Sequence, residues 1–211
     1  MNQAVAQARA VTVTEFSGTV VLNLPHAFVF NEVAFYDFCR ANADLRIERT
    51  AEGEIIVMPP TGWDTGNRNI ELSRQVANWS KSDARGAASD SSTGFILPNK
   101  AERAPDAAWV RRERLAQLTA EQRRKFLPLC PDFAVELMSP TDKLAVVQAK
   151  MEEYIANGAL LGWLLDPDNR TVYVYRPNVP MEKLENVLEV SGDPELPGFV
   201  LQLAEIWEPS I

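Results

Sequence analysis

The fold is decided by residues 131–165, PDFAVELMSPTDKLAVVQAKMEEYIANGALLGWLL. Asp132–Met138 and Gly162–Leu165 are short apolar runs of the length and composition typical of buried strands. Between them, apolar residues recur at helical spacing from Lys143 to Asn157, and Gly158 stands where such a helix ends. This stretch therefore predicts two strands joined by a crossover helix.

The flanking sequence predicts hairpins and further helices around this crossover. Gly53 separates two alternating runs, Leu45–Thr50 and Glu54–Met58, as in a β-hairpin. The other expected elements are a strand or extended arm at Val11–Leu24, a helix at Glu32–Asn42 capped by Asn31, a helix at Arg68–Ser80, a loop at Ser82–Ser92, a strand at Thr93–Leu97 that returns in a hairpin as Asp106–Val110, a short helix from Thr119, a hairpin strand at Thr171–Tyr175, and a series of turns from Pro177 to Trp207. Together they predict an α/β (α+β) fold with a mixed β-sheet flanked by helices.

Length and charge limit the possible classes of protein. A chain of 211 residues, of which 46% are apolar, predicts one domain over residues 1–211, and the patternless residues 1–10 are expected to be flexible. The net charge of −8 argues against a broadly basic nucleic-acid binder, because Lys and Arg supply the affinity for phosphate. Any nucleic-acid contact must use a local patch, or these charges belong to solvated surfaces. The candidate patches are Arg103 with Arg111, Arg112 and Arg114, and the run Arg123–Lys125.

Cysteine and histidine are too scarce to form a metal cluster. The chain has Cys39, Cys130 and a single histidine, His26, with no paired cysteine motif. This composition excludes a zinc-ligand cluster and makes a disulfide framework improbable, so both thiols are expected to be buried and inert. Since no apolar run approaches the roughly 20 residues of a membrane span, we expect a soluble, cytoplasmic protein that does not contact a membrane.

Two acidic residues on short apolar runs carry the chemistry. Glu136 lies inside Phe133–Met138, where a carboxylate loses its hydration unless a cation or a donor meets it. Its alternative role is a structural ion pair with a nearby arginine. Asp106 follows Pro105 at the start of another strand. Together with water and the backbone carbonyl of Leu137, these carboxylates would form a hard-oxygen site for Mg²⁺.

An amine that could balance negative charge at such a site must come from the helix after Glu136. The position two residues after Glu136 is Met138, which cannot donate a proton or bind phosphate. Lys150 lies at the edge of the apolar stripe of the predicted helix, and its long stem can cover apolar surface while the amine reaches the carboxylates. Lys143, one heptad earlier, is the rival.

These motifs, in this order, resemble the Uma-type endonuclease family of proposed restriction enzymes, part of the PD-(D/E)XK nuclease superfamily. The segments that carry the resemblance are Met58–Gly62, Pro105–Val110, Pro131–Asp142, Lys150–Tyr154 and Gly162–Pro167. The resemblance implies a restriction-endonuclease-like core, Mg²⁺ bound by Asp106 and Glu136, and Lys150 in place of the lysine missing at Met138.

The resemblance also implies an earlier acidic residue in the site. Glu48 matches the family position before the glycine-containing hairpin turn, and Glu71 on the second predicted helix competes with it. One departure stands out, because family members often have a histidine after the Pro-Thr-Gly segment, where this chain has Trp63-Asp64.

The leading hypothesis is an endonuclease that hydrolyses DNA phosphodiester bonds with Mg²⁺, or alternatively Mn²⁺. The second hypothesis is a binding or assembly module that keeps the nuclease fold without useful catalysis. Hydrolysis of sugars by paired carboxylates would leave the lysine without a role and is disfavoured. A homodimer, which would present two sites to a duplex, is one option for the assembly. The DNA sequence preference depends on loops whose geometry the amino-acid sequence does not describe.

Overall fold

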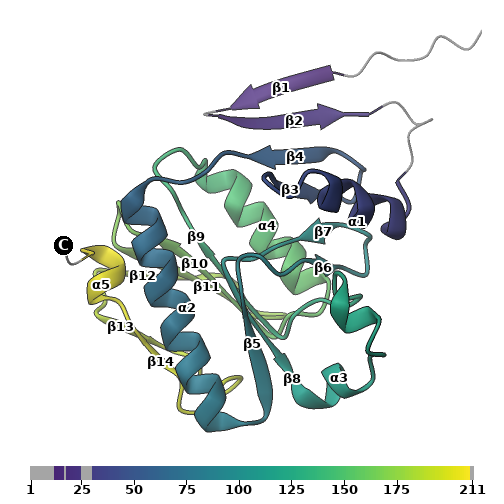
Figure 1. Cartoon of the computed structure of the whole chain (residues 1–211). Coiled ribbons are helices and arrows are strands. Elements are labelled where there is room, and N and C mark those ends of the chain that lie inside the picture. The colour runs from purple at the N-terminus through teal and green to yellow at the C-terminus, as the bar shows by residue number, and fades with distance from the viewer. Residues whose placement is uncertain (1–11, 17, 25–29, 210–211) are drawn as a thin grey trace, which may run out of the picture. The chain divides into compact units, whose positions relative to one another are not determined.

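The structure is a computed structural model that describes residues 12–16, 18–24 and 30–209 (Figure 1). The chain divides into two compact units. Unit 1 comprises residues 1–60 and 99–103, and unit 2 comprises residues 61–98 and 104–211. The expected single domain stays a prediction, and the expected flexible residues 1–10 lie outside the described residues.

Unit 1 contains an antiparallel sheet with the strand order β1-β2-β4-β3-β7. The predicted hairpin around Gly53 is confirmed, and Gly53 adopts a φ of 90° in its turn. The predicted single extended arm is instead a second hairpin, with Gly18 at a φ of 86° between its strands. The strands are β1 (Thr12–Phe16), β2 (Thr19–Asn23), β3 (Arg46–Arg49), β4 (Ile55–Met58) and β7 (Glu102–Arg103).

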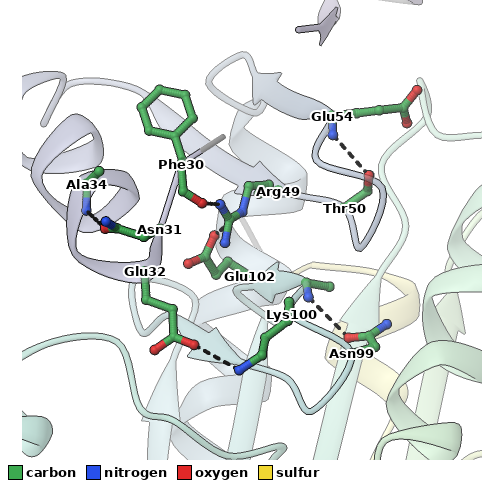
Figure 2. Close-up of polar contacts among 11 residues, drawn as sticks. Phe30, Asn31, Glu32, Ala34, Arg49, Thr50, Glu54, Asn99, Lys100 and Glu102 are labelled. Atoms are coloured by element: carbon green, nitrogen blue, oxygen red, sulfur yellow. Dashed lines mark hydrogen bonds and ion pairs between the residues drawn. The ribbon is translucent and has the colours of Figure 1, made fainter. Parts of the chain in front are cut away.

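Helix α1 (Glu32–Ala41) begins as the sequence predicts, because Asn31 Oδ1 accepts a hydrogen bond from Ala34 N at 2.8 Å. Next to it, Arg49 pairs with Glu102 at 2.6 Å (Figure 2). The Arg49 guanidinium also lies over the Phe35 ring, 5.1 Å from its centroid. Burial raises the pKa of Glu102 to about 7, the Arg49 charge lowers it only in part, and Glu32 adds to the rise.

Unit 2 is built on a six-stranded mixed sheet with the order β12-β11-β10-β9-β8-β5. β9 and β10 are parallel and are joined by α4, whereas the other neighbours are antiparallel. The predicted mixed sheet and its crossover are therefore confirmed. The elements are β5 (Gly86–Asp90), β8 (Ala107–Arg111), β9 (Phe133–Leu137), α4 (Leu144–Ala156), β10 (Leu161–Asp166), β11 (Thr171–Tyr175) and β12 (Glu182–Glu185).

Alternating residues of this sheet face two different helices. Trp109, Phe133 and Trp163 join one buried cluster with Leu72 and Val76 of helix α2 (Trp63–Asp83). The intervening positions face α4, as a close approach at Gly162 illustrates. A Cβ atom built on Gly162 would lie 2.6 Å from Met151 Cε of α4. The sheet is thus covered by a helix on each face, as the hydrophobic pattern of its strands predicts.

The predicted loop at Ser82–Ser92 is wrong, because strand β5 lies within it and pairs with β8. Its side chains are small for a packing reason. A Cβ atom on Gly86 would lie 2.2 Å from Trp109 Cε2 and 2.5 Å from the Val110 carbonyl oxygen. Because an indole ring covers this strand, glycine here serves close packing and does not mark a flexible loop.

Three further predictions change in detail. Helix α2 begins at Trp63, earlier than the predicted Arg68, and its first turn includes Gly66. The predicted hairpin between Thr93–Leu97 and Asp106–Val110 is wrong, since β8 pairs with β5 and β9, while β6 (Phe95–Ile96) bridges to Leu127. Helix α3 (Arg112–Ala116) was not expected.

Thr119 and Gln122 exchange hydrogen bonds of 3.1 and 2.8 Å in the pattern of a capping box, just before the next short helix. The Thr119 signal in the sequence is thereby confirmed, although the turn that follows, Gln122–Arg124, is a 3₁₀ helix.

The C-terminal segment is more ordered than its turn-rich sequence indicates. It forms the antiparallel pair β13 (Glu189–Ser191) and β14 (Val200–Gln202), followed by helix α5 (Ala204–Trp207). Phe199 stacks on Trp163 with ring centroids 5.6 Å apart, which joins this segment to the core of unit 2. Within the described ranges, no helix combines the length and the apolar character required to cross a bilayer.

Candidate functional site

The register of β8 and β9 brings the backbones around the two predicted acids close together. Ala107 pairs with Val135 in an antiparallel register, and Asp106, just before β8, accepts a hydrogen bond from the amide of Leu137, the residue after Glu136. Both residues are almost completely buried, with 6% and 5% exposure. Two acids 30 positions apart in the sequence are therefore neighbours at one end of this strand pair.

Asp106 is fixed by a donor on each oxygen. Leu137 N donates to Oδ2 at 2.8 Å, and Asn69 Nδ2 of α2 donates to Oδ1 at 3.0 Å. The first bond uses the backbone of β9 and the second comes from a helix that packs on the sheet. The carboxylate therefore has a defined orientation before any ligand binds.

Glu136 meets the predicted lysine. Lys150 Nζ lies 2.9 Å from Glu136 Oε1, and the two side chains are only 14% and 7% exposed. Tyr154, one helical turn later on α4, donates from its hydroxyl to the same oxygen at 2.9 Å. Of the two lysines that the sequence offers, Lys143 stands at the N-cap of α4, and the ion pair with Glu136 is formed by Lys150.

The two candidates for the early acidic residue lie in other surroundings. Glu48 belongs to unit 1, where it forms a buried ion pair with Arg103 at 3.3 Å. Glu71 of α2 is held by Arg74 through hydrogen bonds of 2.7 and 2.6 Å, and this contact lowers the pKa of Glu71 below its ordinary value. In unit 2, Glu136 pairs with Lys150 and Asp106 binds the neighbouring Leu137 amide, whereas the role of Glu48 stays a prediction.

The predicted basic patches are largely engaged within the fold. Arg111 and Arg114 both pair with the buried Asp132, at 2.8 and 3.0 Å. Lys125 pairs with Glu121 at 3.1 Å, and Arg123 donates to backbone carbonyls near the end of α3. These contacts stabilise the segment around α3, and they favour the interpretation of these charges as structural surface groups.

The donor set suits a hard divalent cation. Mg²⁺ prefers carboxylate, carbonyl and water oxygens, and Asp106 accepts a hydrogen bond from the backbone of Leu137, the residue that follows Glu136. Leu137, whose amide already contacts Asp106, is the predicted source of a carbonyl ligand. Among the described residues, no group of three His, Cys, Asp or Glu side chains gathers as a metal cluster. A metal here would therefore take its remaining ligands from backbone and solvent.

Sequence reasoning missed Asn69 and Tyr154 as members of this site. Tyr154 was detectable in principle, because it lies four residues after Lys150 and so shares its helical face. Asn69 left no local signal, since its contact with Asp106 depends on how α2 packs against the sheet.

The family model of Uma2, described as "Putative restriction endonuclease", matches residues 33–204. The chain belongs to the Uma2 family. The matched region includes Asp106, Glu136, Lys150 and both newly found donors. The family assignment implied by the resemblance of the motifs is thereby confirmed.

A solved structure supports the fold of this Uma2 protein. The crystal structure described as a putative nuclease belonging to DUF820 from Anabaena variabilis ATCC 29413 superposes with a TM-score of 0.65. The two chains are 20% identical, and the match covers 76% of this chain and 89% of that one. No curated protein matches the chain.

Proposed function

We propose that this Uma2-family protein is a metal-dependent endonuclease that hydrolyses DNA phosphodiester bonds. The observations that support the proposal are the pairing of Glu136 with Lys150, Nζ 2.9 Å from Oε1, and the hydrogen bond of Asp106 with the adjacent Leu137 amide. Carboxylates can hold a divalent cation, and an ammonium group can balance negative charge on a phosphate. Asp106, Glu136 and the Leu137 carbonyl would hold Mg²⁺ or Mn²⁺, which when bound polarises the phosphate and activates water.

The protein groups have separate tasks in this reaction. Water adds to phosphorus, the bond from phosphorus to one ester oxygen breaks, and a phosphate monoester and an alcohol are released. The Lys150 ammonium group, paired with the buried Glu136, would balance the negative charge that grows on the phosphate oxygens. Asp106 is held in place by Asn69 and by the backbone of β9, so its carboxylate need not reorganise during the reaction.

The first test uses purified protein with supercoiled and linear DNA in Mg²⁺ or Mn²⁺. We expect cleavage by the unmodified protein and background cleavage by Asp106→Ala and Glu136→Ala. Glu182→Ala removes an exposed acid on β12 and is the matched control, expected to cleave normally. Equal cleavage by all four preparations would reject the assignment.

A second candidate function is a binding or assembly module on the same fold. It is favoured by the net charge of −8 and by the engagement of Arg111 and Arg114 with Asp132. In that case Glu136 and Lys150 form a structural pair, and calorimetry with Mn²⁺ detects no site that depends on Glu136. A homodimer would serve cleavage of both strands of a duplex, and sedimentation equilibrium measures it directly.

A further inference from the structure

Each of the two carboxylates contacts one neutral side-chain donor from a different helix. Tyr154 of α4 donates to Glu136, and Asn69 of α2 donates to Asp106. The two helices pack on opposite faces of the sheet that carries both acids. The pair of donors therefore reaches the site from two independent directions.

The Tyr154 contact has a fixed polarity. An ionised carboxylate only accepts hydrogen bonds, so the buried Tyr154 hydroxyl must donate its proton toward Glu136 Oε1. Lys150 approaches the same oxygen at 2.9 Å. Two donors on one oxygen fix the rotation of the Glu136 carboxylate about its terminal bond, and this fixes where the second oxygen points.

The orientation of the Asn69 amide is also defined. Ser73 lies one helical turn later, and its hydroxyl approaches Asn69 Oδ1 at 3.5 Å. With the amide oxygen turned toward Ser73, the amide nitrogen faces Asp106 Oδ1 at 3.0 Å. Because Leu137 N occupies Oδ2, the Asp106 carboxylate is held at both ends.

We propose that Tyr154 and Asn69 are positioning residues, which hold Glu136 and Asp106 in the orientation that binds the metal ion. This inference rests on the proposed nuclease function and deepens it. Groups that hydrogen-bond to metal ligands orient them, and their loss typically costs about 10- to 100-fold in metal affinity or activity. Neither residue contacts DNA in this proposal, so each acts only through its carboxylate.

The experiment uses the full-length protein with Tyr154→Phe and Asn69→Ala. The Tyr154→Phe variant removes one oxygen and keeps the ring in the core. Its matched control is Tyr173→Phe, which removes the hydroxyl of another buried tyrosine, in β11. The control for Asn69→Ala is Asn78→Ala, an exposed residue of the same helix.

Four quantities are measured for each variant: the Mn²⁺ dissociation constant by calorimetry without DNA, kcat and KM for a duplex substrate, and the melting temperature. We expect Tyr154→Phe and Asn69→Ala each to weaken Mn²⁺ binding and to lower kcat. The loss in metal affinity or in kcat should be about 10- to 100-fold for each variant. KM for DNA stays unchanged. Both controls retain the metal affinity and kcat of the unmodified protein.

The proposal is overturned if the two variants lower the melting temperature but keep the Mn²⁺ affinity and kcat of their controls. In that case both residues serve the fold alone. A failure of the proposed function looks different, because the unmodified protein then neither binds Mn²⁺ nor cleaves DNA. That result removes the site itself, together with any role for residues that position it.

Discussion

At the scale of single residues, the sequence identifies a charged group as a site candidate when apolar neighbours imply a high free-energy cost of desolvation. Glu136 was conspicuous because it interrupts an apolar strand, and the structure gives it two donors from one helix. Because position 138 is a methionine, the candidate amine comes from the following helix. The desolvation argument does not identify Asn69, because a polar residue on a partly exposed helix can be hydrated and needs no protein partner.

Lys150→Met is expected to lower kcat by about 100- to 1000-fold, because it removes the charge that balances the phosphate in the transition state. Lys150→Arg keeps the charge and should retain part of the activity. Cleavage of a defined duplex under single-turnover conditions measures both effects. Lys143→Met, at the N-cap of the same helix, is the control. If it reduces kcat as strongly as Lys150→Met, the choice between the two lysines is wrong.

At the scale of elements, periodic segments could be predicted and tightly packed segments without a period could not. The crossover helix and its strands carry repeating apolar positions, and each appears close to its predicted bounds. Strand β5 has small and polar residues, which locally resemble a loop. The Trp109 ring over Gly86 explains the glycine in this strand, and that ring belongs to β8, which lies beyond the following loop in the sequence.

The two glycines Gly66 and Gly86 are expected to respond oppositely to alanine. Gly86→Ala should lower the free energy of unfolding by about 1–3 kcal/mol, because the added methyl group overlaps Trp109. Gly66→Ala should raise it by about 0.5–1 kcal/mol, since Gly66 lies within α2 and an added Cβ meets nothing within 4 Å. Urea unfolding measures both changes. A stabilising Gly86→Ala would show that β5 is not packed under the indole.

At the scale of the whole molecule, the sequence predicted the class of fold but not the division into two compact units. Alternation and helical spacing report which face of an element is buried. They do not report which elements share a core, because that depends on contacts between distant segments. The same limit applies to Glu48, whose sequence position suggested a site residue and whose described ion pair is with Arg103.

Glu102 is expected to make stability depend on pH. Its pKa is raised from 4.5 to about 7, chiefly by burial, so between these values the folded chain keeps a proton that the unfolded chain has released. Its contribution to stability is complete below pH 4.5 and is lost as pH rises through 7, on the order of 3 kcal/mol in all.

Glu102→Gln should therefore flatten the fall in unfolding free energy between pH 4.5 and 7. Urea unfolding followed by circular dichroism, repeated across this range, gives the slope. The exposed Glu52→Gln, from the turn between β3 and β4, is the control and should leave the slope unchanged. An identical slope for Glu102→Gln and the unmodified protein contradicts the assignment.

The contact of Glu136 with Lys150 and Tyr154 joins residues of one uninterrupted strand–helix segment. The lysine can therefore stand at a different sequence position within this segment, on the strand or on the helix, without any rearrangement elsewhere in the chain. A motif search that requires a fixed sequence spacing between the glutamate and the lysine misses proteins in which the lysine has moved. Such proteins are recognised by comparing the position of the lysine ammonium group in space, whichever element carries the lysine.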